Sequence, residues 1–177
     1  FVEMGHTMPT AYGQEIVDEV TAVFKAGVAA LGIRDGAAKG DIKYTRQGAF
    51  VGEIAARLSG GYMSGWTYPY ASGIEATAEA LDIACGVTPV FKEPALEMVC
   101  SERAWISIPG KVADIVNVDK ARAAASQSGA VRELFPRAGT GDRVVFPCNN
   151  VEKCGNIIAV APSRAEADSL AESAARS

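Results

Sequence analysis

Two acidic residues, Asp41 and Glu53, are spaced so that a short hairpin would bring their side chains together. The segment Arg46-Gln47-Gly48 between them is typical of a tight turn, because glycine readily adopts the left-handed conformation that such turns need. If the turn is centred on Gln47, Asp41 faces Glu53 across two antiparallel strands. Directly opposed carboxylates repel each other, so we expect a cation between them. Magnesium would meet that need, since it takes carboxylate oxygens and shares its remaining positions with phosphates.

The same hairpin pairing predicts which side chains share a face with the two acids. We expect the acidic face to carry Asp41, Lys43, Thr45, Val51, Glu53, Ala55 and Arg57. We expect the core face to carry Ile42, Tyr44, Phe50, Ile54 and Ala56. The guanidinium of Arg57 could then neutralise a phosphoryl group held near the acids. A plainer alternative is that Lys43 forms a surface ion-pair cluster with both carboxylates.

Elements that could position this hairpin are visible on both sides of it. Apolar residues recur at helical spacing from Thr10 to Leu31, which predicts a long amphipathic helix. Residues 41–45 and 49–56 predict the two strands of the hairpin. A glycine-rich aromatic loop follows over residues 59–73, and Ser72 has the spacing of an N-cap for the next helix.

The chain changes character after Pro89, where short β-rich runs predict a second, mostly antiparallel unit. Within it we expect one short helix near residues 119–126. Ser163 and Glu166 have the spacing of a capping box, which predicts that a terminal helix begins there. Four cysteines occur without a Cys-x-x-Cys pair, and we expect them to be unpaired thiols.

Charge and hydropathy exclude some classes of function. Seventeen basic and twenty-one acidic residues give a net charge of −4, without a basic cluster of the kind that binds nucleic acid. Charges interrupt every apolar stretch well before the roughly 18 residues that a membrane span needs. We therefore expect a cytoplasmic protein with no nucleic-acid or membrane partner. Because the residues from Phe1 to Met4 have a pattern typical of the middle of a strand, we expect further residues upstream.

The run from Gly40 to Gly61 resembles the metal-binding end of the ATP-grasp superfamily. In that family an acid stands twelve residues before the Glu of a Glu-Ile-x-x-Arg motif, and a glycine pair follows. Residues 1–88 have the element order of the family's last subdomain, which is strand, long helix, acidic hairpin, glycine loop and helix. Residues 107–112 and 155–158 resemble the domain that follows in biotin carboxylase-like and carboxylate–amine ligase branches.

This resemblance implies an α+β fold in two parts. Residues 1–90 would be the C-terminal part of an ATP-grasp domain, an antiparallel sheet with flanking helices. Residues 91–177 would be a small, mostly antiparallel β-rich C-terminal domain. The resemblance covers nearly the whole chain, and it is most specific around Glu53.

The resemblance also implies roles for individual residues. Asp41 and Glu53 match the family's ligands for Mg2+ or Mn2+, and Arg57 matches the catalytic arginine that stabilises an acyl-phosphate intermediate. Gly60 and Gly61 match the turn beside the acceptor substrate.

Two positions qualify this assignment of roles. His6 lies in an expected loop between the first strand and the long helix, and it is a further candidate for contact with substrate. At the position of Ala55 the family often has an asparagine that completes the shell of a second metal ion, so the resemblance does not extend to a second metal.

The implied activity is that of an ATP-dependent ligase, which uses ATP to activate a carboxylate as an acyl phosphate that an amine-type acceptor then attacks. ATP, a small carboxylate and the acceptor would be its partners, and a homodimer is compatible with the sequence. We expect this chain to be inactive without the N-terminal half, which would hold most of the nucleotide. The alternative is a degenerate, non-catalytic ATP-grasp module that only binds a partner or metabolite.

Overall fold

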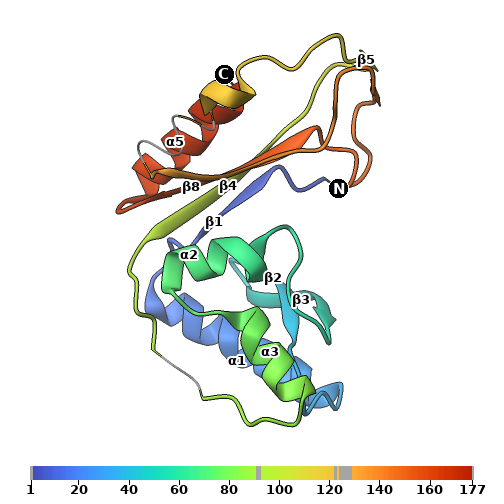
Figure 1. Cartoon of the computed structure of the whole chain (residues 1–177). Helices are drawn as coiled ribbons and strands as arrows, with labels where there is room; N and C mark the ends of the chain where they lie inside the picture. Colours follow the sequence, from blue (N-terminus) through green and yellow to red (C-terminus); the bar gives the residue numbers. More distant parts are fainter. Residues whose placement is uncertain (1, 91–92, 122, 124–128, 177) are drawn as a thin grey trace. The chain divides into compact units, whose positions relative to one another are not determined.

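The structure is a computed structural model that describes residues 2–90, 93–121, 123 and 129–176 (Figure 1). The described elements are β1 (Gly5–Met8), α1 (Gln14–Ala30), β2 (Lys39–Thr45), β3 (Gly48–Ala55), the π-helix η1 (Met63–Thr67), α2 (Tyr68–Ser72), α3 (Ala76–Ala84), β4 (Val99–Trp105), β5 (Gly110–Lys111), β6 (Val131–Pro136), β7 (Arg143–Val144), β8 (Gly155–Ala161) and α5 (Arg164–Arg176).

These elements belong to two compact units, which we describe separately. The sheet unit consists of the described residues up to Pro9, Tyr70–Ser72 and those from Ala95 onward. The hairpin unit consists of Thr10–Pro69 and Gly73–Pro94. The sequence-based division of the chain between residues 90 and 91 stays a prediction.

The sheet unit is built on an antiparallel sheet with the strand order β1-β4-β8-β6. All seven residues of β8 are buried, and their apolar run Ile157–Ala161 explains why this strand lies inside the sheet. Helix α5 packs on β4 and β8, where Ala171 joins Val131 and Ile157 in the core. The short strands β5 and β7 form a separate pair.

Helix α5 begins where its capping box predicts. The Ser163 hydroxyl oxygen accepts a hydrogen bond of 3.3 Å from the amide of Glu166, which satisfies one of the donors that a helix start leaves free. This sequence-based prediction is confirmed.

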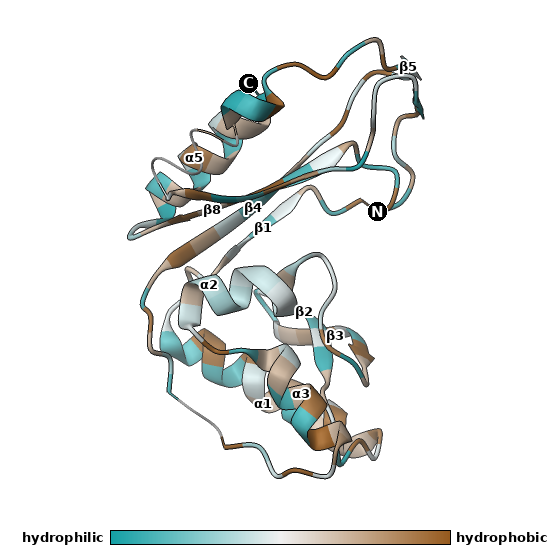
Figure 2. Cartoon of the chain, viewed as in Figure 1, coloured by the Kyte–Doolittle hydropathy of each residue, from teal (hydrophilic) through white to brown (hydrophobic). Residues whose placement is uncertain are grey.

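The hairpin unit packs α1 against the β2–β3 hairpin. Figure 2 shows hydrophilic and hydrophobic residues interleaved along α1, as expected for an amphipathic helix at a surface. The helix is shorter than predicted because Gly13, in an extended conformation, forms its N-cap. Gly32 follows the helix with φ of +68°, a conformation that glycine adopts easily and that ends helices.

The predicted N-cap at Ser72 is wrong. Ser72 is the last residue of α2, a short helix inside the segment that we predicted as a loop. Gly73 follows with φ of +76°, so the chain leaves α2 there and α3 starts only at Ala76, with Glu75 as its N-cap. The motif therefore coincides with the end of one helix and not with the start of the next.

The fold class is confirmed, since the chain is an α+β protein with antiparallel sheets and helices. All four cysteines are free, as predicted. No helix within the described ranges is long and apolar enough to cross a membrane. Of the predicted short helix at residues 119–126, residues 119–121 and 123 are helical, and the other positions lie outside the described residues.

Candidate functional site

The strands β2 and β3 bring Asp41 directly opposite Glu53, as the hairpin pattern predicts. The register changes between Asp41 and Ile42, which pairs with Val51, so Gly52 is an extra residue that forms a β-bulge. A side chain at position 52 would press on the carbonyl oxygen of Asp41, because its Cβ would lie 3.1 Å away. Glycine at this position therefore allows the bulge that places the two acids opposite each other.

The bulge also corrects part of the predicted register. Near the turn Thr45 pairs with Gly48 and Lys43 with Phe50. A turn centred on Gln47, as we predicted, would instead pair them with Ala49 and Val51. The turn thus contains two residues instead of three. Beyond the bulge the predicted and the observed registers coincide. The predicted pairing of the acids is therefore right, although the predicted pairing near the turn is wrong.

Two predictions about faces are wrong for the same reason. Phe50 pairs with Lys43 and is 48% exposed, although we placed it on the core face. Val51, which we placed with the acids, lies on the helix side, where it and Ile54 come close to Gly27 of α1. A shift of one residue exchanges the faces of a strand, and the bulge restores the predicted alternation from Glu53 onward.

The two carboxylates converge on the ammonium group of Lys39. Its Nζ lies 2.8 Å from Asp41 Oδ2 and 2.8 Å from Glu53 Oε1. Hydrogen bonds to Asp41 and then to Glu53 raise the pKa of Lys39, so the ammonium stays charged. We expected a metal ion between the acids and gave an ion-pair cluster with Lys43 as the alternative. In the structure Lys39 makes these ion pairs, and Lys43 makes none within the described residues.

Both acids remain open to water, with the side chain of Asp41 67% exposed and that of Glu53 55% exposed. Exposed ion pairs contribute little to stability, typically about 0–1 kcal/mol, because water screens them. A divalent ion on this face would have to displace the ammonium of Lys39, whose side chain is 13% exposed, or bind beside it. The donor set of two exposed carboxylates on one face suits a hard cation such as Mg2+.

Arg57 lies close to the acids, just beyond the end of β3. Its Nη2 is 3.9 Å from Glu53 Oε1, and its Nη1 donates a hydrogen bond of 3.0 Å to the carbonyl of Leu58. Gly60 and Gly61 follow in a turn, where Gly61 has φ of +60°. The structure thus groups Asp41, Glu53 and Arg57, while the metal-binding, catalytic and substrate-binding roles of these residues stay predictions.

We expected His6 in a loop, and this prediction is wrong. His6 lies in the strand β1 of the sheet unit, where it pairs with Glu102 of β4. Its Nδ1 lies 3.3 Å from Glu3 Oε1 and 3.4 Å from Glu102 Oε2. Glu102 is 1% exposed, and its other oxygen accepts a hydrogen bond from the Asn156 amide. The donor atoms of Glu3, His6 and Glu102 lie within 4.8 Å of one another.

The charge of His6 depends on two opposing effects. Burial alone would lower the pKa of His6, but hydrogen bonds and charges from Glu102 and Glu3 outweigh it and raise the pKa above its ordinary value. An imidazolium at this position lies close to both carboxylates and offsets one of their two negative charges without a metal ion. It also ties β1 to β4, because Glu102 is fixed in the core of the sheet.

This arrangement predicts a pH-dependent contribution of His6 to folding. Because the folded-state pKa is raised, the contribution is full below the ordinary pKa of 6.5 and is lost as the pH rises through the folded-state pKa. We expect the His6→Gln variant to be less stable than the wild type at pH 5.5 and nearly as stable at pH 9. Urea unfolding at both values measures the difference, and a gap that widens with rising pH would contradict the ion pairing.

Three residues of these clusters were missed by the sequence analysis. Lys39 stands two residues before Asp41, so strand alternation places it on the same face, and extending the predicted strand toward its start would have found it. Glu3 and Glu102 offered no such signal. Glu102 meets His6 through pairing of strands that are far apart in the sequence, which spacing cannot reveal.

Comparisons with known proteins identify the class of fold. Residues 104–177 match a family model described as L-amino acid ligase C-terminal domain 2. The solved L-amino acid ligase from Bacillus licheniformis superposes with a TM-score of 0.84 at 17% identity, covering 98% of this chain and 42% of that one. A search of curated protein sequences gave no significant match.

Two further solved structures show the same likeness. Phosphoribosylglycinamide synthetase from Anaerococcus prevotii has a TM-score of 0.78 at 16% identity, covering 99% of this chain and 44% of that one. N5-carboxyaminoimidazole ribonucleotide synthetase from Thermotoga maritima has a TM-score of 0.69 at 16% identity, covering 97% and 44%. The chain spans less than half the length of these relatives.

The fold is that of the C-terminal part of an ATP-grasp ligase, and the resemblance found in the sequence is confirmed. Within this class, residues 104–177 are similar to the second C-terminal domain of L-amino acid ligases.

Proposed function

We propose that this chain is the C-terminal half of an ATP-dependent carboxylate–amine ligase. In this reaction a carboxylate oxygen attacks the γ-phosphorus of ATP and ADP leaves. The amine then attacks the acyl carbon, phosphate leaves and an amide forms with loss of a proton. The observation that carries the proposal is the pairing of Asp41 with Glu53 across the hairpin, on a face open to water.

Asp41 and Glu53 would hold Mg2+, or Mn2+ in its place. When bound, the ion would supply positive charge to the phosphates of ATP. Catalysis of phosphoryl transfer rests mainly on positioning and charge neutralisation, so the protein must hold these acids still. The contacts of the hairpin suit this task, because Glu19 of α1 accepts the amide of Ala49 at 2.9 Å and so anchors β3 to the helix.

The other residues of the site would stabilise negative charge or leave room for the substrate. Arg57, held beside Glu53, would place its guanidinium against the transferred phosphoryl group and stabilise the acyl phosphate. Gly60 and Gly61 lack side chains and would let the acceptor substrate come close to the backbone. His6 would be a further residue in contact with substrate.

The nucleotide would lie mostly in an N-terminal half that this chain does not contain. The relatives support this, since each is more than twice as long as the part that this chain covers. The chain by itself should therefore not turn over ATP. ATP, a small carboxylate and an amine-type acceptor would be the partners of the intact enzyme, with no nucleic acid or membrane, and the cytoplasm would be its location. Self-association as a homodimer remains part of this proposal.

One observation favours a second candidate, a non-catalytic module that has lost metal binding. Lys39 already bridges both acids at 2.8 Å, and Ala55 replaces a residue that the family often uses for a second metal. In such a module the lysine would be a permanent substitute for the ion.

Titration of Mg2+ into the chain separates the two candidates. We expect saturable shifts of the backbone NMR signals around Asp41 and Glu53, at least about tenfold weaker binding in Glu53→Gln, and tighter binding in Lys39→Met, which removes the competing ammonium. Lys43→Met is the matched control, because it removes the same charge from the same face without contact to either acid. If neither the wild type nor Lys39→Met binds, the module is favoured.

A further inference from the structure

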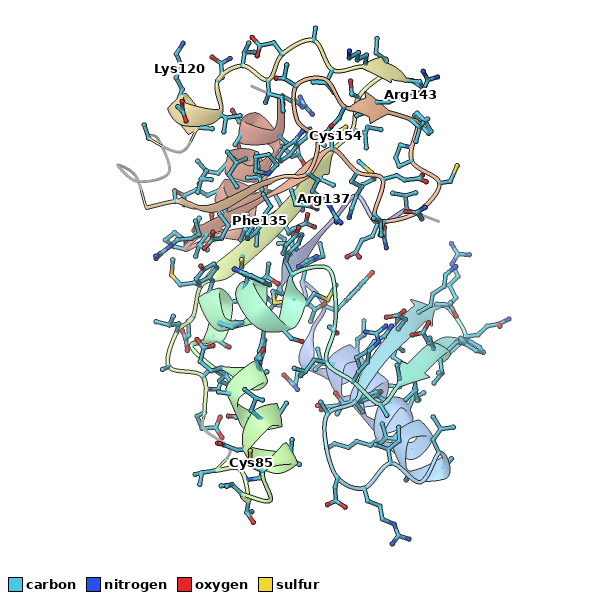
Figure 3. All side chains as sticks on the ribbon, turned by 45° about the vertical axis from the view of Figure 1, so that its right-hand side comes forward. Cys85, Lys120, Phe135, Arg137, Arg143 and Cys154 are labelled. Atoms are coloured by element: carbon cyan, nitrogen blue, oxygen red, sulfur yellow. The ribbon has the colours of Figure 1, made fainter. Side chains whose placement is uncertain are left out.

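The sheet unit contains a polar pocket that is independent of the acidic hairpin and of the function proposed for the hairpin. It has a volume of about 400 Å³ and is formed by residues 137–138, 142–145 and 151–153. Three of its lining residues carry positive charge. They are Arg137 after β6, Arg143 on β7 and Lys153 before β8, and Figure 3 labels the two arginines.

The two acidic residues that line the pocket are engaged with loop amides. Asp142 Oδ2 accepts a hydrogen bond of 2.7 Å from the amide of Gly139, and Glu152 Oε2 accepts one of 2.7 Å from the amide of Cys148. These bonds shape the walls of the pocket. Neither acid forms an ion pair with a pocket cation within the described part of the chain.

The three cations outnumber the two acids that line the pocket, and none of the three forms an ion pair among the residues that the structure describes. Arg137 and Arg143 are exposed and form no ion pair there, and Lys153 is 5% exposed. The only acceptor that Lys153 Nζ reaches in the described structure is the carbonyl oxygen of Glu3, at 2.9 Å. Burial of an ammonium group that no carboxylate pairs with is costly, and an anion bound in the pocket would offset that cost.

The rest of the wall is apolar. Val144 is buried, whereas Val145 and Val151 are 43% and 70% exposed. Pockets for small molecules commonly combine a few converging charges with such an apolar lining, and 400 Å³ falls within their usual size. The two arginines can each offer a planar fork of donors to a phosphate or a carboxylate, while the lysine acts as a point charge.

We propose that this pocket binds a small organic anion, which presents a phosphate or carboxylate group to Arg137, Arg143 and Lys153 and its carbon skeleton to the valines. Phosphate and carboxylate share the chemistry that the cations recognise, so both must be tested.

The test titrates the full chain with inorganic phosphate and, separately, with succinate at constant ionic strength, followed by NMR. We expect at least one probe to cause saturable shifts of signals from residues 137–153. Arg137→Gln and Arg143→Gln should each weaken that binding by about threefold to tenfold, and Lys153→Met by more. The probe that binds more tightly identifies the recognised group.

Lys120→Gln is the control, because it removes an exposed charge of the same unit that Figure 3 shows well apart from both arginines. It should leave the affinity unchanged. Equal binding in the wild type and in both arginine variants would overturn the proposal, even if Lys153→Met fails to fold. Absence of saturable shifts with both probes would overturn it as well.

Discussion

Replacing Glu53 with Gln in the proposed intact ligase is expected to lower kcat by at least about a hundredfold and to leave the fold unchanged. The loss corresponds to roughly 3 kcal/mol of transition-state stabilisation, a moderate share of what a bound metal ion can supply. The amide keeps the shape of the side chain but removes the charge that Asp41 and Glu53 would share with the ion. Steady-state kinetics with saturating ATP and Mg2+ measures the effect.

The fold should survive because Glu53 is 55% exposed and only its ion pairs with Lys39 and Arg57 are lost. Asp35→Asn is a suitable control, since Asp35 is an exposed acid of the same unit outside this cluster. Its kcat should equal that of the wild type. Turnover by Glu53→Gln within a factor of about three of the wild type would remove Glu53 from the mechanism, whereas a wild type without any turnover would support the non-catalytic module.

The position of Glu53 shows which features of this fold can be predicted from the local sequence pattern. The hairpin, the long helix and the opposition of the two acids follow from periodicity and turn residues alone, because each depends on neighbours in the chain. The one-residue error near the turn has a physical cause. Glycine at position 48 and glycine at position 52 both permit irregular backbone, and only the structure reveals that the bulge is at Gly52.

Contacts between distant segments could not be predicted in this way. His6 was expected in a loop, but in the structure it lies in β1 and pairs with Glu102, ninety-six positions later. The same limit applies to the polar pocket, whose cations Arg137 and Lys153 had no visible relation in the sequence. Both clusters depend on the strand order β1-β4-β8-β6, which periodicity does not encode.

Capping motifs illustrate a second limit. The Ser163 motif and the Ser72 motif have the same residue spacing, yet only Ser163 caps a helix. Gly73 distinguishes them, because a glycine directly after the serine lets the chain turn with positive φ and end the preceding helix α2. A capping motif interrupted by glycine is therefore weaker evidence for a helix start.

Replacing Arg57 with Ala in the proposed ligase is expected to lower kcat by about a hundredfold to a thousandfold, with little change in the KM for ATP. The guanidinium is held 3.9 Å from Glu53 and is 56% exposed, so it is available to a ligand on the acidic face. Its charge matters most when negative charge develops on the transferred phosphoryl group. Such an interaction appears in kcat more than in ground-state binding.

The conservative variant Arg57→Lys distinguishes charge from geometry. Lysine keeps the positive charge but not the planar fork of donors, so we expect it to recover only part of the lost activity. Arg46→Ala is the matched control, because Arg46 is an exposed arginine in the turn of the same hairpin and lies outside the acidic cluster. If Arg46→Ala and Arg57→Ala reduce kcat equally, the effect reflects the general charge of the hairpin. A loss confined to Arg57 would instead place its guanidinium at the reacting phosphoryl group.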